Sequence, residues 1–168
     1  MSLYQDDSIL KELMDIISLD HVKNYIEVRT DSIQKQLNSC PTETEWLCET
    51  IPAETFQSII KSAADLTMPT EIRLIRLFIL RRNTQFKYEN HVNSYQRLYS
   101  LRNNGKMFVK LDNKHQWEST AVNMGQWHCV SPNTWHYPYS NTDNDWITLT
   151  FHTQSSEDII DRYDYEKN

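Results

Sequence analysis

Glycine is nearly absent from this chain: Gly105 and Gly125 are the only two among 168 residues. A phosphate-binding loop needs several glycines to bring its backbone close to the anion, so a nucleotide site of that class is excluded. No motif of a catalytic nucleophile occurs either. In so glycine-poor a sequence, we expect both glycines to mark turns where the backbone takes a positive φ angle.

Cysteine is also scarce. The three residues Cys40, Cys48 and Cys129 are odd in number, and no pair has C-x-x-C spacing. The sequence therefore indicates neither a disulfide framework nor a zinc knuckle, and reduced thiols in a cytoplasmic protein are expected. No apolar run approaches the length of a membrane span, and the acidic, polar N-terminus is unlike a secretory signal.

Positive charge is in deficit, with 17 Lys and Arg against 23 Asp and Glu and a net charge of −6. Such a surface repels phosphate backbones, so we expect neither nucleic acid nor a membrane as partner. The one local cluster of arginines, between Arg73 and Arg82, is interrupted by Leu and Ile, and we interpret it as the solvent face of a strand. A homodimer is left open as the assembly.

What the chain does have is enough apolar residues, 39%, for one domain with one core. Residues 1–70 read as a helical segment of that domain, because apolar side chains recur at helical spacing over 6–38. Pro52 stands where a first-turn proline starts a further helix.

The pattern of residue types changes at residue 71. Short segments rich in large apolar and β-branched side chains recur to residue 154, with turn residues between them. The last one, 146–152, alternates cleanly between two faces. These features predict an antiparallel sandwich or barrel over 71–154, followed by a polar tail over 155–168. Helices first and strands second favour an α+β fold with the helices packed on one face of the sheets.

Two motifs in the strand region resemble those of the cupin superfamily. The segment from Gly125 through Pro132 and His136 to Asn141 is similar to the second cupin motif. The segment that begins His91-Val-Asn93 is similar to the first, with Asn93 in place of the second histidine. The resemblance implies N-terminal helices packed on a double-stranded β-helix, a cupin-like jelly-roll barrel, with His91 and His136 as metal ligands.

Within that superfamily, the pattern is nearest to 2-oxoglutarate-dependent oxygenases of the aspartyl/asparaginyl β-hydroxylase type. That group manages with two histidines and carries an arginine-bearing strand just after the first, which residues 95–101 resemble. The resemblance implies Fe(II) or another divalent metal, 2-oxoglutarate as cosubstrate, and a small molecule or a protein side chain as substrate. Iron(II) accepts imidazole nitrogens well, and oxygen activation needs open coordination positions.

Further site residues follow from these patterns. Asn93 is expected as a weak or indirect ligand, and Glu89 is the nearest carboxylate on the same strand face that could substitute. Arg97 is the preferred anchor for the cosubstrate carboxylate, because its planar fork grips carboxylates with two bonds. Lys106 and Lys110 are the alternatives to Arg97, and Asn141 completes the second motif.

Several readings stay open. His128 is either an alternate ligand or, as we favour, a buried structural residue, and we expect His115 and His152 at the surface or rim. Four tryptophans crowd the strand region and either pack the core or line an aromatic pocket; they are Trp117, Trp127, Trp135 and Trp146. The alternative functions are a non-catalytic cupin binding module with a decayed metal site and a metal-dependent isomerase or lyase.

Overall fold

The computed structural model describes residues 8–61, 65–111, 116–141 and 143–164. Its helices are α1 (Ser8–Ile17), α2 (Asp20–Ser39) and α3 (Ala53–Lys61), and strand β1 (Trp46–Pro52) lies between α2 and α3. Pro52 ends β1 and directly precedes α3, as suits a residue with a fixed φ angle and no backbone N–H. Among the described residues, no helix is long and apolar enough to cross a membrane.

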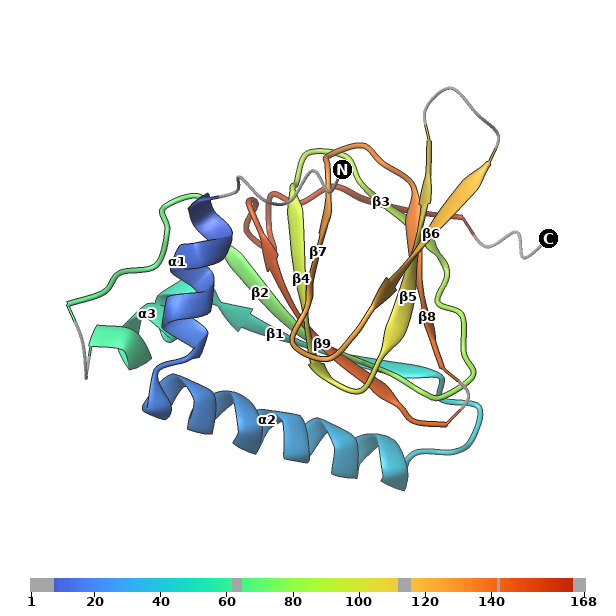
Figure 1. Ribbon diagram of the computed structural model, residues 1–168, viewed down its shortest axis with the longest axis horizontal. Coiled ribbons are helices and arrows are strands. Elements are labelled where there is room, and N and C mark those ends of the chain that lie inside the picture. Colours follow the sequence, from blue (N-terminus) through green and yellow to red (C-terminus); the bar gives the residue numbers. More distant parts are fainter. Residues whose placement is uncertain (1–7, 62–64, 112–115, 142, 165–168) are drawn as a thin grey trace.

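The remaining strands are β2 (Leu74–Leu80), β3 (Tyr88–His91), β4 (Gln96–Arg102), β5 (Gly105–Lys110), β6 (Trp117–Val122), β7 (Trp127–Val130), β8 (His136–Ser140), β9 (Trp146–His152) and β10 (Asp161–Asp164). They form a first sheet, β1-β2-β9-β4-β7, and a second sheet, β10-β3-β8-β5-β6. The two sheets face each other across an interior (Figure 1). Apart from the β5–β6 hairpin, consecutive strands from β2 onward lie in opposite sheets. This is the winding of a jelly-roll barrel.

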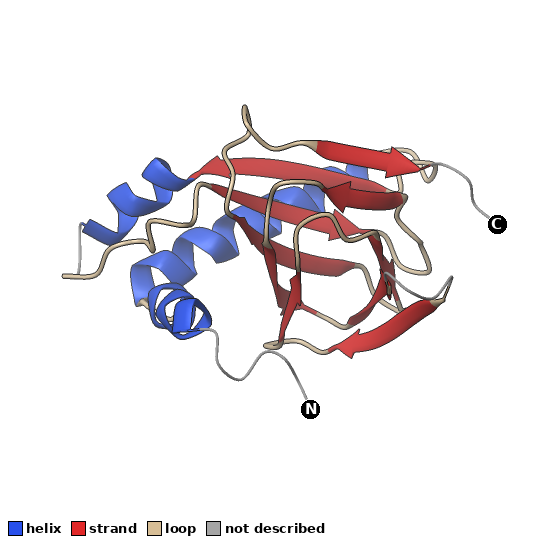
Figure 2. Ribbon diagram, turned by 90° about the horizontal axis from the view of Figure 1, so that it is seen from above, coloured by secondary structure: helices blue, strands red, loops and turns tan. Residues whose placement is uncertain are grey.

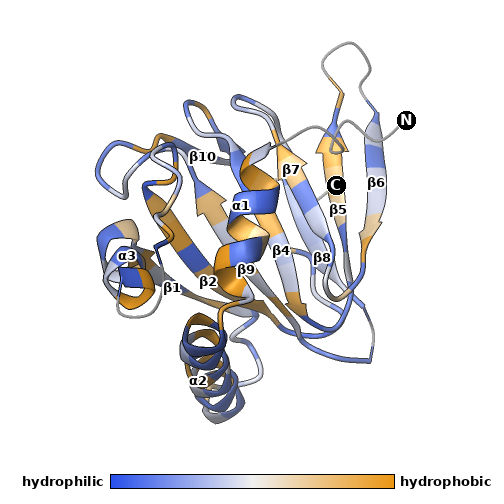
Figure 3. Ribbon diagram, turned by 60° about the vertical axis from the view of Figure 1, so that its left-hand side comes forward, coloured by the Kyte–Doolittle hydropathy of each residue, from blue (hydrophilic) through white to orange (hydrophobic). Residues whose placement is uncertain are grey.

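The three helices lie along the outside of the first sheet (Figure 2). Successive side chains of β9 alternate between the helix-covered face of the first sheet and the barrel interior. Ile147, Leu149 and Phe151 belong to the core shared with the helices, whereas Thr148, Thr150 and His152 line a cavity inside the barrel. In Figure 3, β2 is hydrophobic apart from one hydrophilic band, and β4 carries residues of both kinds. The interior of the barrel is therefore the more polar side of the sheet.

Two strands lie outside the range 71–154 that the sequence indicates for the barrel, namely β1 and β10. Each is an edge strand with one neighbour in its sheet. Most residues of both strands are only partly buried or exposed. An edge strand with one solvated face carries little of the apolar alternation that marks an inner strand, so pattern reading misses it.

The two glycines meet different structural requirements. Gly125, in the turn before β7, has a φ angle of +82°, as expected for a residue without a side chain. Gly105 begins β5, and a Cβ atom there would lie 2.1 Å from Cε3 of Trp146. Its role is close approach between the sheets, not a positive φ angle, which corrects the sequence expectation. Asparagine supplies positive φ angles elsewhere, at residues 83, 103 and 133, which explains how the barrel manages with so little glycine.

Candidate metal centre

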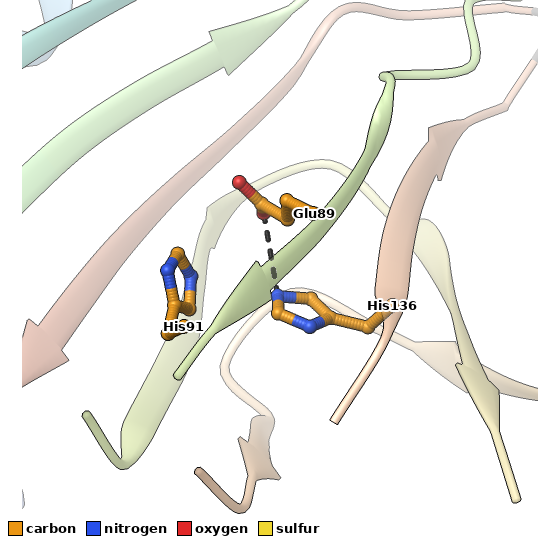
Figure 4. A group of neighbouring side chains, drawn as sticks. All are labelled: Glu89, His91 and His136. Carbon is orange, nitrogen blue, oxygen red and sulfur yellow. Dashed lines mark ion pairs between the residues drawn. The ribbon is translucent and has the colours of Figure 1, made fainter. Parts of the chain in front are cut away.

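Glu89, His91 and His136 converge inside the barrel. Their ligating atoms all lie within 4.8 Å of one another, and their side chains come from two adjacent strands (Figure 4). Glu89 and His91 share a face of β3 because strand side chains repeat every second residue. The pairing of Glu89 with His136 brings in the third side chain. The two histidines are 2% and 0% exposed and Glu89 is 9% exposed.

Hydrogen bonds fix which nitrogen of each imidazole is available. Nδ1 of His136 lies 2.9 Å from the carbonyl oxygen of Thr134, and Nδ1 of His91 lies 2.6 Å from Oδ1 of Asp161. A carbonyl or carboxylate oxygen only accepts, so each Nδ1 carries the proton. Nε2 is then the nitrogen of each ring that is placed to act as a metal ligand. Among the described residues, neither buried Nε2 has a hydrogen-bond partner.

The contact between Glu89 and His136 indicates what belongs in this space. Oε1 of Glu89 lies 3.3 Å from Nε2 of His136. Burial raises the pKa of Glu89, but the contact with His136 and the nearness of His91 outweigh burial, so the net pKa is lowered and the side chain is a carboxylate. A carboxylate beside an imidazole nitrogen in a dry interior needs a cation between them, either a proton or a metal ion. The three donors fit a divalent metal.

Asp161 supports the site from β10. It pairs directly with His91 in the sheet register, and Nη2 of Arg76 lies 3.0 Å from its Oδ2. Burial raises the pKa of Asp161, but the hydrogen bond from His91 and the charge of Arg76 lower it well below the usual value. An ionised carboxylate behind a ligating histidine orients the ring and makes the far nitrogen a better donor to a metal.

Two further histidines point into the barrel. His152 is 0% exposed, and its ring centroid lies 4.7 Å from that of His91. Burial, and then the nearness of His91 and Arg76, push the pKa of His152 well below its usual value, so this ring is neutral. His128 is also buried, and its pKa is lowered to about 4 by burial and by His136. His152 is therefore interior, which corrects the expectation of a surface or rim residue, and His115 lies outside the described residues.

A cavity of about 270 Å³ opens beside the cluster, and both Glu89 and His91 line it. Its apolar wall includes Trp46, Phe78 and Phe86. The four tryptophans of the predicted strand region are all absent from the described lining residues, and the tryptophan in the wall, Trp46, precedes that region. Trp146 instead fills the barrel core at 1% exposure. The cavity also has two basic residues, Arg76 and Lys87.

The structure does not bring Asn93 to the cluster, because β3 ends at His91 and the chain turns. Nδ2 of Asn93 donates to the carbonyl of Asp158, and its Oδ1 accepts from the backbone N–H of Ile160. Both amide atoms are thus engaged in holding the segment that leads into β10. Asn93 stabilises the approach to Asp161 instead of facing the metal position.

Arg97 lies on the opposite face of its strand from the cavity. It pairs directly with Phe151, which belongs to the core between the sheet and the helices. Its guanidinium lies 4.4 Å from the ring centroid of Tyr95. The neighbours Gln96 and Leu98 line the cavity instead, as strand alternation requires.

Lys110 and Asn141 are also absent from the described lining of the cavity. Lys110 is the last residue of β5, and its Nζ lies 6.0 Å from the ring centroid of Trp117. Asn141 follows β8, and its carbonyl accepts the backbone N–H of Asn83. Of the residues predicted for the site, the structure therefore brings together His91 and His136, with Glu89 as the substituting carboxylate.

Sequence reasoning missed Asp161, Arg76 and Lys87. Asp161 lay in a segment expected to be a polar tail, and Arg76 was interpreted as solvent-facing. A signal for Arg76 does exist, because it stands among large apolar residues on a strand whose two faces are both covered. Nothing in the sequence marks Lys87, whose position depends on the loop before β3.

No family model matches the chain, and no match was found among curated proteins. Solved structures do resemble it. Peruvianin-I, a cysteine peptidase from Thevetia peruviana latex, has a TM-score of 0.56 at 10% identity, over 74% of this chain and 69% of that chain. Bacillus subtilis oxalate decarboxylase, studied for its Mn(II) centres, has a TM-score of 0.56 at 13% identity, over 76% of this chain.

The chain spans only 30% of the oxalate decarboxylase chain. The share is the same for the structure of that enzyme determined at pH 4.6. These neighbours are cupin proteins, and at such low identity the likeness carries the fold alone. The fold is thus that of a cupin, a jelly-roll barrel of two antiparallel sheets. The cluster inside it is a candidate centre for a divalent metal ion.

Proposed function

We propose that this protein is a mononuclear metalloenzyme in which Glu89, His91 and His136 hold one divalent metal ion, with iron(II) as the resident metal. The observation that carries the proposal is that two buried Nε2 atoms and an ionised carboxylate converge at one point, neither Nε2 having a hydrogen-bond partner among the described residues. Two histidines and one carboxylate on one side of a metal are typical of non-haem iron(II) oxygenases. Iron bound there would supply open coordination positions for oxygen and for a chelating cosubstrate.

The protein residues supply orientation and a dry environment. Asp161 and the carbonyl of Thr134 keep the protons on Nδ1 of the two rings, so each Nε2 stays available. His152 adds a neutral imidazole to the cavity wall. We propose a hydroxylase that uses 2-oxoglutarate, acts on a small molecule or a protein side chain, and works in the cytoplasm. Because Arg97 lies on the far face of its strand, we propose that the anchor for that cosubstrate comes from the cavity wall instead.

A manganese-dependent lyase is the second candidate. It is favoured by the structural likeness to oxalate decarboxylase with its Mn(II) centres and by a cavity sized for a small acid. The two candidates differ in whether oxygen and 2-oxoglutarate are consumed.

The test begins with anaerobic loading of the purified protein with Fe(II) or Mn(II), followed by metal analysis. We expect about one metal per chain, and loss of metal in His136→Ala. The matched control His21→Ala removes an imidazole from helix α2 and should bind metal normally. Release of succinate from 2-oxoglutarate with uptake of oxygen supports the hydroxylase, whereas release of CO₂ from oxalate by the Mn(II) form supports the lyase. Failure to retain either metal would leave a binding module with a decayed site.

A further inference from the structure

A second cavity, of about 300 Å³, lies on the helix-covered side of the first sheet, away from the barrel interior. Tyr99 and Leu101 reach it from β4 and pack against the core beneath the helices, whereas Leu98 lines the barrel cavity instead. The two cavities have no described lining residue in common. The apolar part of the second lining consists of Met14, Ile17, Ile26, Tyr99 and Leu101.

One polar side chain lies deep in this lining. Thr30 is only 2% exposed, and it is the one polar member of the buried face of α2, which consists of Val22, Ile26, Thr30, Ile33 and Leu37. Among the described residues, Oγ1 of Thr30 has no hydrogen-bond partner. Because an unpaired hydroxyl is costly to bury, the position favours a ligand that supplies the missing bond.

A hydroxyl group on a helix has an ordinary way to pair, which is to donate to the carbonyl oxygen four residues earlier. Ser18, Ser39 and Ser58 each make that bond in this chain. Within the part of the chain that the structure describes, Thr30 does not. Its hydroxyl therefore remains able both to donate to and to accept from a molecule in the cavity.

The charged side chains at the cavity favour a neutral ligand. Lys23 and Glu27 both line it, four residues apart on α2, and they carry opposite charges. Arg102 also lines it, and its Nη2 lies 2.7 Å from Oδ1 of Asp31. An ionised ligand would lose its hydration and find no net charge among these side chains in return.

The size of the cavity limits the ligand to a small molecule. Its volume of about 300 Å³ is at the lower end of the range of roughly 300–1,000 Å³ for ligand pockets. At about 30 Å³ for each water molecule, the space holds a molecule of roughly ten non-hydrogen atoms. A medium-chain aliphatic alcohol has that size.

We propose that this cavity binds a small neutral alcohol, whose hydroxyl group pairs with Oγ1 of Thr30 and whose aliphatic chain packs against Met14, Ile17 and Leu101. The hydroxyl group enters first, because Thr30 is almost fully buried whereas Met14 is 39% exposed. The site is independent of the proposed function, since no ligand of the candidate metal centre takes part in it.

NMR of the methionine methyl groups, with 1-octanol as the probe, tests the site because a methionine lines each cavity. Met14 reports on the helix-side cavity and Met107 on the barrel cavity. In metal-free protein labelled at the methionine methyl carbons, we expect a saturable shift of the Met14 signal and none of the Met107 signal. Octanoate has the same chain length but carries a charge, so it should bind at least about tenfold more weakly.

Thr30→Val keeps the shape of the side chain and removes its hydroxyl group. It should weaken octanol binding about three- to tenfold, as expected for one neutral hydrogen bond. It should not lower the melting temperature, because no described residue bonds to that hydroxyl. Leu101→Trp, which fills the cavity, should abolish binding. The matched control Thr120→Val removes an exposed hydroxyl group of β6 and should leave the affinity unchanged.

The outcomes are distinct. A Met14 signal that does not move up to the solubility limit of octanol overturns the site, and so does a shift confined to Met107. Equal affinities for octanoate and octanol, or for octanol in Thr30→Val and the unmodified protein, overturn the neutral alcohol as the class of ligand. None of these results alters the case for the metal centre, whose ligands lie on the other side of the first sheet.

Discussion

At the scale of single residues, the candidate centre depends on the groups that hold the ligands as much as on the ligands themselves. Asp161 is the clearest example, because it contacts His91 through one oxygen and Arg76 through the other. Asp161 thereby links the metal position in the second sheet to Arg76 in the first sheet. Removing its charge should affect metal binding without removing any ligand.

We expect Asp161→Asn to weaken zinc binding about 10- to 100-fold, because the partner behind a ligating histidine sets its orientation and basicity. Competition with a chromogenic chelator measures the affinity. The control Asp158→Asn alters a carboxylate in the preceding loop that bonds to Ser155, and it should leave zinc affinity unchanged. Equal zinc affinity in Asp161→Asn and the unmodified protein would show that Asp161 plays no part in the centre.

The sequence indicates His91 and His136 because each stands in a recognisable motif. It also allows Glu89 as a ligand, because side chains repeat every second residue along a strand. The same rule misplaces Asn93, since it assumes that the strand continues past His91. The contact between Arg76 and Asp161 is beyond sequence reasoning, because it joins the two sheets between residues 85 positions apart.

At the scale of secondary structure elements, the distance between the two sheets is set where β5 begins. Gly105 pairs with both Val122 and Ser140, and the ring of Trp146 occupies the place of its missing side chain. Nε1 of Trp146 also donates to Oγ of Ser100 at 2.9 Å, so the ring cannot turn away without losing that bond. Inner strands such as β9 can be read from their alternation, whereas this contact between sheets cannot.

Gly105→Ala should therefore lower the free energy of unfolding by about 2 kcal/mol or more, as expected for overpacking of a close contact. Gly125→Ala is the comparison, because its Cβ would meet nothing closer than 3.8 Å and only its φ angle of +82° is strained. We expect it to cost about 1 kcal/mol. Guanidinium unfolding of both variants measures the difference, and a cost for Gly105→Ala no larger than for Gly125→Ala would refute the packing role.

At the scale of the whole molecule, the barrel interior gathers several buried ionisable groups. Glu89, His91, His128, His136 and His152 are all at most 9% exposed. Burying these ionisable groups costs stability, and the apolar core between the helices and the first sheet offsets that cost. This arrangement is expected of a protein whose interior serves a function.

The stability of the metal-free protein should therefore fall in acid. His128 takes up a proton near pH 6.5 when unfolded but only near pH 4 when folded, because burial lowers its pKa to about 4. Between these values the unfolded state binds more protons, so the free energy of unfolding falls as pH falls, by about 1.4 kcal/mol per pH unit for each such group. His152 acts in the same direction, and Asp161 and Glu89 extend the loss below about pH 4.

Urea unfolding between pH 7 and pH 4 checks this expectation, and His128→Gln should flatten part of the slope. A free energy of unfolding that stays constant across that range would mean that the buried imidazoles titrate as they do in water.

The most direct measurement is anomalous X-ray diffraction from crystals of the metal-loaded protein, recorded at the absorption edge of the bound metal. We expect a single strong peak inside the barrel, about 2.0–2.2 Å from Nε2 of His91, from Nε2 of His136 and from a carboxylate oxygen of Glu89. Loaded crystals with no peak between these three side chains, or with a peak only at another place on the chain, would contradict the assignment of the metal centre.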